Sequence, residues 1–284
     1  MNGQPEHASL DPLLPAEMAA RAEAIGAAKA TLPLLNLVAL GVLAGAFIAL
    51  GANFFTTATT STELGYGPTR LLGGMAFSLG LILVVIAGAE LFTGNNLMVM
   101  AWAARRVSTV ALLRAWALVY AGNFIGAVAT AAIVALSGQW RFAGHDVGAN
   151  AVRIANAKVN LDFAEAFFLG VLCNALVCLA IWLTYSARSN LDKALAVLFP
   201  ITAFVASGYE HSIANMYFIP LGLMLKSHDA VLAAGDLDAA GLADLDVANF
   251  LLANLLPVTA GNLAGGGLLV GAVYWFIYRR NASA

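Results

Sequence analysis

The chain has 284 residues, of which 61% are apolar and only 11% are charged, with a formal net charge of −2 at pH 7. Soluble domains carry roughly 25% charged residues, so this composition excludes an ordinary soluble domain. Repeated apolar runs of about 20 residues predict an all-α polytopic membrane protein, and the slightly negative net charge excludes a typical nucleic-acid-binding protein.

Residues 1–33 are predicted to form a cytoplasmic, amphipathic N-terminal arm. We expect no secretory signal peptide, because the charged residues of this stretch are not followed by a short apolar core. The segment from Pro12 to Lys29 is typical of a short amphipathic helix, with four apolar side chains on one face: Leu13, Leu14, Met18 and Ile25. The arm is either a gate or partner-binding element, or a surface helix that covers one end of the bundle.

Residues 34–280 are predicted to form the transmembrane domain. We expect six apolar spans, at residues 34–58, 70–102, 109–136, 163–186, 194–226 and 247–278. The second and fifth spans are too long for one plain crossing of about 20 residues. Each of them is therefore predicted to be a broken helix, in which two half-helices flank a loop.

The two predicted breaks carry the same polar pattern, Gly-x-Glu-x4-Asn, at positions 120 residues apart. The pattern comprises Gly88, Glu90 and Asn95 in the second span, and Gly208, Glu210 and Asn215 in the fifth. Lipid cannot satisfy irregular backbone, so such loops must lie inside protein or along a cavity. We expect the two glutamates and the two asparagines to support the breaks by binding the exposed N–H groups.

Two further matches extend the repeat. Residues 41–43 read Gly-Val-Leu, as do residues 170–172, and residues 121–123 read Ala-Gly-Asn, as do residues 260–262. Each half thus holds three spans with the break in the middle one. An odd number of spans per half requires the second half to insert upside down, so the pattern predicts two inverted three-helix repeats.

The distribution of basic residues predicts that both termini are cytoplasmic. Nine lysines and arginines then lie inside and five outside; the inner ones are Arg21, Lys29, Arg105, Arg106, Arg114, Arg188, Lys193, Arg279 and Arg280, and the outer ones are Arg70, Arg141, Arg153, Lys158 and Lys226.

His211 is the ionisable residue in the most informative position, since it directly follows the acid of the second break. Intramembrane ionisable groups commonly mark a transport pathway, and burial disfavours the charged imidazolium form. Thr93 lies in the opposite break and is either a partner of His211 or a hydroxyl bonded to its own helix. Asn174 braces neighbouring helices in the default interpretation, and Lys158 is expected in the outer loop before the fourth span.

Three stretches of the chain resemble the formate–nitrite transporter family: residues 77–93, 199–216 and 256–267. The resemblance covers almost the whole chain and implies an aquaporin-like protomer, a homopentamer and one pore in each protomer. It also implies a central histidine and threonine, carried here by His211 and Thr93, with Asn174 near the pore and Lys158 at its outer mouth.

The resemblance further implies two apolar constrictions on either side of the central pair. The outer constriction corresponds to Phe77 and Phe204, and the inner one to Leu81, Leu91, Phe92 and Val177. A bare anion that crosses such rings meets a large desolvation cost, which protonation near the middle removes. His211 and Thr93 are expected to supply or share that proton, and Lys158 to attract the anion.

We therefore predict a homopentameric channel in the bilayer of the bacterial inner membrane that passes formate in both directions, passively or coupled to protons. No enzymatic activity, metal or cofactor is expected, and the arm is a possible site for a cytoplasmic partner. Nitrite, hydrosulfide, acetate or lactate are alternative substrates. A haem-bearing redox subunit is a less favoured class, because axial ligation commonly uses paired histidines and only His211 lies within the predicted spans.

Overall fold

The computed structural model describes residues 12–281, and every regular element in that part of the chain is helical. Five helical stretches are long and apolar enough to cross a membrane: Leu34–Ala58, Tyr66–Gly88, Thr109–Ser137, Phe163–Ser186 and Ala240–Tyr278. A shorter apolar helix covers Ser212–Leu225. The coarse prediction of an all-α protein with several apolar spans agrees with this architecture.

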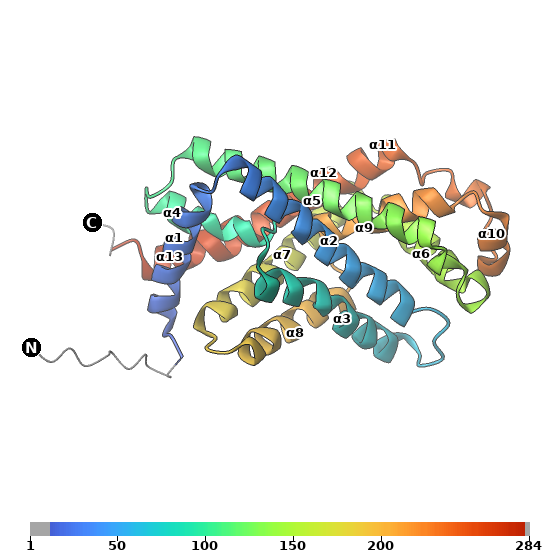
Figure 1. The fold of residues 1–284 in the computed structure, drawn as a ribbon, viewed down its shortest axis with the longest axis horizontal. Coiled ribbons are helices and arrows are strands. Elements are labelled where there is room, and N and C mark those ends of the chain that lie inside the picture. The colour runs from blue at the N-terminus through green and yellow to red at the C-terminus, as the bar shows by residue number, and fades with distance from the viewer. Residues whose placement is uncertain (1–11, 282–284) are drawn as a thin grey trace, which may run out of the picture.

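Short helices gather at the two ends of the elongated molecule (Figure 1). Helices α1 (Pro15–Ala30), α4 (Val99–Ala103) and α13 (Val273–Tyr278) lie at one end, which we call the arm end. Helices α6 (Asp146–Val159) and α10 (Asp229–Gly235) lie at the opposite end. Three short 3-10 turns complete the connections, at Gln139–Arg141, Ala143–His145 and Ala240–Leu242.

Helix α1 begins close to the predicted start of the arm helix. The Glu17 carboxylate accepts a hydrogen bond from the backbone N–H of Leu14 (2.7 Å), which stabilises the first turn. Met18 is buried as predicted, but the Leu14 side chain is 68% exposed. The expectation for Leu14 was wrong because this residue precedes the helix and turns away from the bundle.

Small residues bring the long helices into contact. Helix α2 (Leu34–Ala58) packs along α5 (Thr109–Ser137), and a Cβ atom added at Gly126 would overlap the carbonyl oxygen of Val42. Helix α7 (Phe163–Ser186) meets α12 (Leu256–Asn262) in the same way, at Gly261. Backbone contact of this kind replaces the hydrophobic driving force that lipid cannot supply.

The last span is helical throughout but contains two π-helical stretches. It runs through α11 (Val247–Asn249), η6 (Phe250–Leu255), α12, η7 (Leu263–Ala272) and α13.

The second predicted span is broken at the predicted segment, between Gly88 and Gly94, and the helices on its two sides differ in length. Helix α3 (Tyr66–Leu83) continues as the π-helical turn η1 (Val84–Gly88), and the chain becomes helical again at η2 (Gly94–Met98) before α4. The helix before the break is therefore long enough to span by itself, which corrects the prediction that this segment is only a half-helix.

The fifth predicted span consists of two helices that are each short for a membrane crossing. Helix α8 (Asn190–Ala206) has 17 residues and α9 (Ser212–Leu225) has 14. Gly88 and Gly208 adopt positive φ angles of 83° and 77°, a conformation that costs glycine little and other residues much more. The matched glycines of the sequence pattern thus turn the chain at both breaks.

One location was predicted wrongly. Lys158 was assigned to a loop before the fourth span, whereas it lies in the last turn of α6. The amphipathic helix α6 escaped the sequence analysis because its buried face is built largely of small residues, such as Ala149, Ala151 and Ala155.

Candidate functional site

An asparagine side chain holds the first break from a neighbouring helix. The Asn123 amide nitrogen in α5 donates to the carbonyl oxygens of Gly41 (2.7 Å) and Glu90 (2.9 Å). Its amide oxygen accepts from the backbone N–H of Phe92 (2.9 Å). A single buried side chain therefore satisfies two backbone groups of the break, Glu90 C=O and Phe92 N–H, and ties them to the Gly41 carbonyl oxygen of α2.

The second break is held in the same way by Asn262 of α12. Its amide nitrogen donates to the carbonyl oxygens of Gly170 (2.8 Å) and Glu210 (3.0 Å), and its oxygen accepts from the N–H of Ser212 (3.0 Å). We call this arrangement the asparagine clasp. It occurs at both breaks and involves residues that the sequence repeat relates to one another.

Each break glutamate is bound by an asparagine and a lysine. Glu90 accepts from the amide of Asn95 (2.7 Å) and pairs with the ammonium of Lys29 (3.0 Å), which also donates to the Asn95 side-chain oxygen (2.6 Å). The two sequence-predicted support residues of the first break are thus in contact. Lys29 comes from α1, at the arm end.

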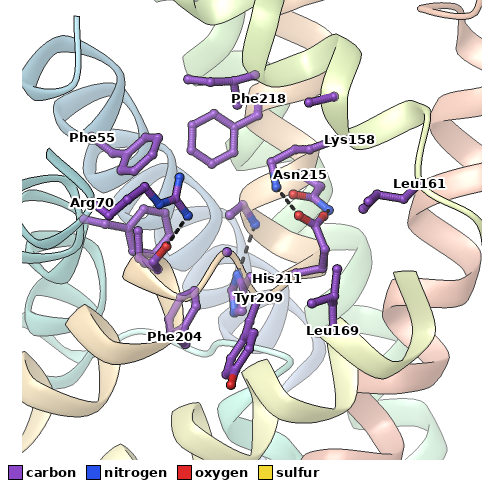
Figure 2. Close-up of a pocket in the computed structure, with 17 residues that line it drawn as sticks. Phe55, Arg70, Lys158, Leu161, Leu169, Phe204, Tyr209, His211, Asn215 and Phe218 are labelled. Atoms are coloured by element: carbon purple, nitrogen blue, oxygen red, sulfur yellow. Dashed lines mark hydrogen bonds and ion pairs between the residues drawn. The ribbon is translucent and has the colours of Figure 1, made fainter. Parts of the chain in front are cut away.

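The second cluster repeats this pattern from the opposite end. Glu210 accepts from the amide of Asn215 (2.7 Å) and pairs with the ammonium of Lys158 (2.6 Å), as Figure 2 shows. Asn254 adds a contact, since it accepts from Asn215 (2.7 Å) and donates to the carbonyl oxygen of Lys158 (2.8 Å). The sequence analysis gave Asn254 no role.

The sequence analysis also gave Lys29 no specific role. Lys29 and Lys158 are 129 positions apart, the same shift that relates Gly41 to Gly170. Extending the repeat beyond the apolar spans would have identified α1 and α6 as matching helices, each carrying a lysine to a break glutamate.

His211 lies at the start of α9 and is only 3% exposed. Its Nδ1 atom accepts a hydrogen bond from the backbone N–H of Ala214 (3.1 Å), so the ring caps the helix. Its Nε2 atom lies 2.9 Å from the hydroxyl oxygen of Thr93, which is fully buried. An Nδ1 that accepts cannot carry a proton, so in the neutral ring the proton is on Nε2 and is donated to Thr93.

This assignment determines which further hydrogen bond the His211–Thr93 pair can make. Because the Thr93 hydroxyl accepts from His211, its own hydrogen is available to another acceptor. Charging the ring at Nδ1 would break the cap of α9. The geometry therefore favours a neutral imidazole whose hydrogen-bonding chain ends in a hydroxyl donor.

The first cavity, the histidine-side cavity, has a volume of about 280 Å³ and contains His211 in its lining. Phe77 and Phe204 line it and meet edge to face, with ring centroids 5.6 Å apart. Lys158 and Arg70 supply its positive charges (Figure 2). The Arg70 guanidinium donates to the carbonyl oxygens of residues 205 and 206 (2.5 and 3.1 Å), and so caps the end of α8.

Arg70 is a second residue that the sequence analysis left without a site role. In the sequence, Arg70 stands at the beginning of a predicted span, and this position indicates only a charge at the membrane surface. Its contact with the break depends on how α3 packs against α8, which no local pattern encodes.

The second cavity, the arm-side cavity, has a volume of about 520 Å³ and is lined by α1, by the first break and by parts of α7 and α8. Glu90, Leu91 and Asn95 line it together with Lys29. The two cavities are bordered by helices from opposite ends of the molecule, α6 for one and α1 for the other.

The four residues predicted for the inner constriction are all buried: Leu81, Leu91, Phe92 and Val177 are at most 4% exposed. Leu91 lines the arm-side cavity. The Phe92 ring packs edge to face on Tyr120 (4.8 Å) and lines a groove beside it, and its place in the constriction stays a prediction.

Asn174 connects the two breaks. Its amide nitrogen donates to the side-chain oxygen of Asn96 (2.8 Å), the carbonyl oxygen of Asn262 (2.7 Å) and, more weakly, that of Thr93 (3.3 Å). Its own oxygen is buried without a hydrogen-bond partner among the described residues. Asn174 thus lies next to the His211–Thr93 pair, through the backbone carbonyl of Thr93.

Comparison with known proteins places this site in context. The family model described as "Formate/nitrite transporter" matches residues 16–276. The formate channel FocA of Escherichia coli K12 is 46% identical over 274 residues, which cover 95% of this chain and 96% of that protein. The probable formate transporter of Methanothermobacter thermautotrophicus is 36% identical, over 93% of this chain and 96% of that protein.

A solved structure described as a pentameric formate channel with formate bound has a TM-score of 0.81 and 43% identity. The match covers 86% of this chain and 97% of the solved chain. An ion channel of the same family has a TM-score of 0.75, with coverage of 92% and 98%. These relatives are channels and transporters rather than enzymes. Since both sequence and structure match over nearly their full lengths, the chain belongs to the formate/nitrite transporter family.

Proposed function

We propose that the chain forms a homopentameric channel for formate in the bacterial inner membrane, with both termini in the cytoplasm and six spans arranged as two inverted three-helix repeats. The matched asparagine clasps and the matched Lys–Glu–Asn clusters support the repeat. The solved pentameric relative supports the assembly and the substrate class.

The observation that carries the function is the buried His211–Thr93 pair beside the histidine-side cavity. A formate anion drawn toward Lys158 and Arg70 passes Phe77 and Phe204 and reaches a hydroxyl donor in an apolar setting. A hydrogen bond from Thr93, backed by the His211 Nε2–H, stabilises the anion until a proton delivered by water converts it to formic acid, and the neutral imidazole keeps its own proton. Formic acid then crosses the inner constriction of Leu81, Leu91 and Val177 without the desolvation cost of an ion.

In this proposal Glu90, Glu210, Asn95 and Asn215 keep their predicted supporting role at the breaks, and Asn174 holds the two breaks together. The place of Phe92 in the constriction stays a prediction, and its packing on Tyr120 supports the first break.

Stopped-flow flux through proteoliposomes tests the function. We expect formate uptake that rises as the external pH falls, and a pentamer by native mass spectrometry. Competition by nitrite, hydrosulfide, acetate and lactate measures selectivity. A properly assembled protein with no formate flux at any pH between 5 and 8 would contradict the proposal; this range, roughly, brackets the ordinary titration of histidine.

A further inference from the structure

The arm-side cavity contains more positive charge than its carboxylate neutralises. Three cationic side chains line it, Arg21, Lys29 and Lys193, and its one carboxylate is Glu90. Glu90 is already bound by Lys29 and Asn95. Three positive charges less one negative charge leave a net charge of +2 in the cavity lining.

The two remaining cations have no acidic partner among residues 12–281. Arg21 on α1 donates one hydrogen bond, to the carbonyl oxygen of Tyr185 (2.9 Å), which leaves most of its N–H donors unused. The ammonium of Lys193 on α8 has no hydrogen bond or ion pair in that part of the chain. Its neighbour Asp192 is occupied, because it accepts from the backbone N–H groups of Arg188 (3.1 Å) and Ser189 (2.9 Å).

The size of the cavity suits an anion larger than the transported one. Its volume of about 520 Å³ compares with roughly 30 Å³ for one water molecule in the liquid. Attraction to two uncompensated cations grows with the charge of the ligand, so a dianion is favoured over a monoanion. The buried side chain of Leu91 forms part of the cavity wall, and the desolvation cost of passing such apolar side chains is prohibitive for a dianion.

We infer that the arm-side cavity is a binding site for a divalent oxyanion of the phosphate class, held between Arg21 of α1 and Lys193 of α8. Such a ligand occupies the mouth of the pathway without passing through it, and so inhibits transport. Binding itself does not depend on the transported species, whereas the inhibition rests on the proposed function.

Isothermal titration of the purified full-length channel with inorganic phosphate, at constant ionic strength in phosphatidylcholine nanodiscs, tests the site. We expect one phosphate per chain. Arg21→Gln and Lys193→Gln should each weaken binding by about tenfold, the equivalent of one charge-assisted hydrogen bond. Arg105→Gln, at an exposed arginine outside the cavity, is the control and should bind phosphate like the parent protein.

Lys193→Gln is the variant that guards the test against misfolding. Arg21→Gln removes a hydrogen bond to the Tyr185 carbonyl oxygen, whereas the Lys193 ammonium makes no such contact among residues 12–281. Equal phosphate affinity in the parent and both variants would overturn the inference. Loss of phosphate binding when the nanodiscs contain phosphatidylglycerol would also overturn it, because a lipid headgroup would then be the natural occupant.

Flux measurements separate the two proposals. Phosphate should slow formate flux with a half-inhibitory concentration that matches its dissociation constant, and less so in Lys193→Gln. If the protein passes formate but neither binds phosphate nor is slowed by it, the proposed site is rejected and the transport proposal stands. Phosphate binding with the expected variant pattern in a protein that passes no formate would support the site and contradict the transport proposal.

Discussion

At the scale of single residues, the two ring nitrogen atoms of His211 have different roles. Nδ1 caps α9 and Nε2 contacts Thr93, so a single substitution can remove one role or both. Asparagine is a good helix cap but places no donor where Nε2 lies. The two functions of the ring are therefore separable by experiment.

We expect His211→Asn to preserve assembly and to alter severely the size and pH dependence of formate flux. His211→Phe should have the same effect on flux and in addition lower the stability by about 1 kcal/mol, the usual worth of a cap. Flux assays and thermal unfolding of the purified pentamers check this. A His211→Asn channel with the parent pH profile would contradict the assigned role of the ring.

The break glutamates are also residue-scale features, but their contacts are structural. Glu210→Ala leaves the ammonium of Lys158 buried without its partner, which should cost on the order of 3 kcal/mol. Glu90→Ala should cost less, because the side chain of its partner Lys29 is 26% exposed. We expect both variants to lower the pentamer yield and the melting temperature, with the larger loss in Glu210→Ala. Normal yield of Glu90→Ala with changed transport would instead assign that carboxylate to the pathway.

At the scale of elements, the asparagine clasp explains how a helix can break inside the bundle. Asn262 binds two backbone groups of the second break, Glu210 C=O and Ser212 N–H, and also donates to the Gly170 carbonyl oxygen of α7. Asn262→Ala should destabilise the protein by at least about 2 kcal/mol, since buried unpaired backbone groups are costly. Thermal unfolding compares it with Asn160→Ala, whose side chain makes only exposed hydrogen bonds and should change little. Equal melting temperatures for the two variants would show that the clasp contributes nothing.

Much of this element-level structure could be predicted from the sequence. The Gly-x-Glu-x4-Asn pattern located both breaks, because glycine, a carboxylate and an amide are the groups that an interrupted helix needs. Ala-Gly-Asn marked the positions of both clasp asparagines as part of the repeat, but it did not indicate their specific partners. The length of the helix before the first break was not predicted, since apolar composition does not distinguish α3 and η1 from the shorter α8.

The site itself was only partly predictable. His211, Thr93 and the break residues stand out because polar groups are rare in apolar runs. Arg70, Asn254 and Lys29 lie near the ends of helices, where charged and amide side chains are common, and only tertiary packing brings them to the breaks. Phe92 shows the converse, because an apolar residue beside a break can face either way and the sequence gives no sign of which.

At the scale of the whole molecule, the arm is joined to the last helix. Glu23 of α1 is only 1% exposed, and both of its oxygens accept from the guanidinium of Arg279, at 3.0 and 3.1 Å. A bidentate pair of this kind is strong and directional. The ends of the described chain therefore support one another across 256 residues of sequence.

Arg279→Gln removes the charge that compensates the buried Glu23 carboxylate and should weaken the docking of α1. We expect faster tryptic cleavage at Arg21 and Lys29, with the bundle itself intact. Arg280→Gln is the matched control, because this exposed residue stacks on Phe276 and its side chain has no hydrogen bond or ion pair with the described part of the arm, residues 12–33. Identical cleavage rates in both variants would mean that other contacts are sufficient to hold α1.

Because the Glu23–Arg279 ion pair joins α1 to the end of the last helix, its opening can be followed by energy transfer between two dyes. A donor dye at the exposed Leu14 and an acceptor dye at Arg280 would label the two segments that this ion pair joins. The two native thiols, Cys173 and Cys178, are buried and would not compete for labelling at introduced cysteines. Energy transfer within one protomer would then report lifting of the amino-terminal segment in real time, while ions flow.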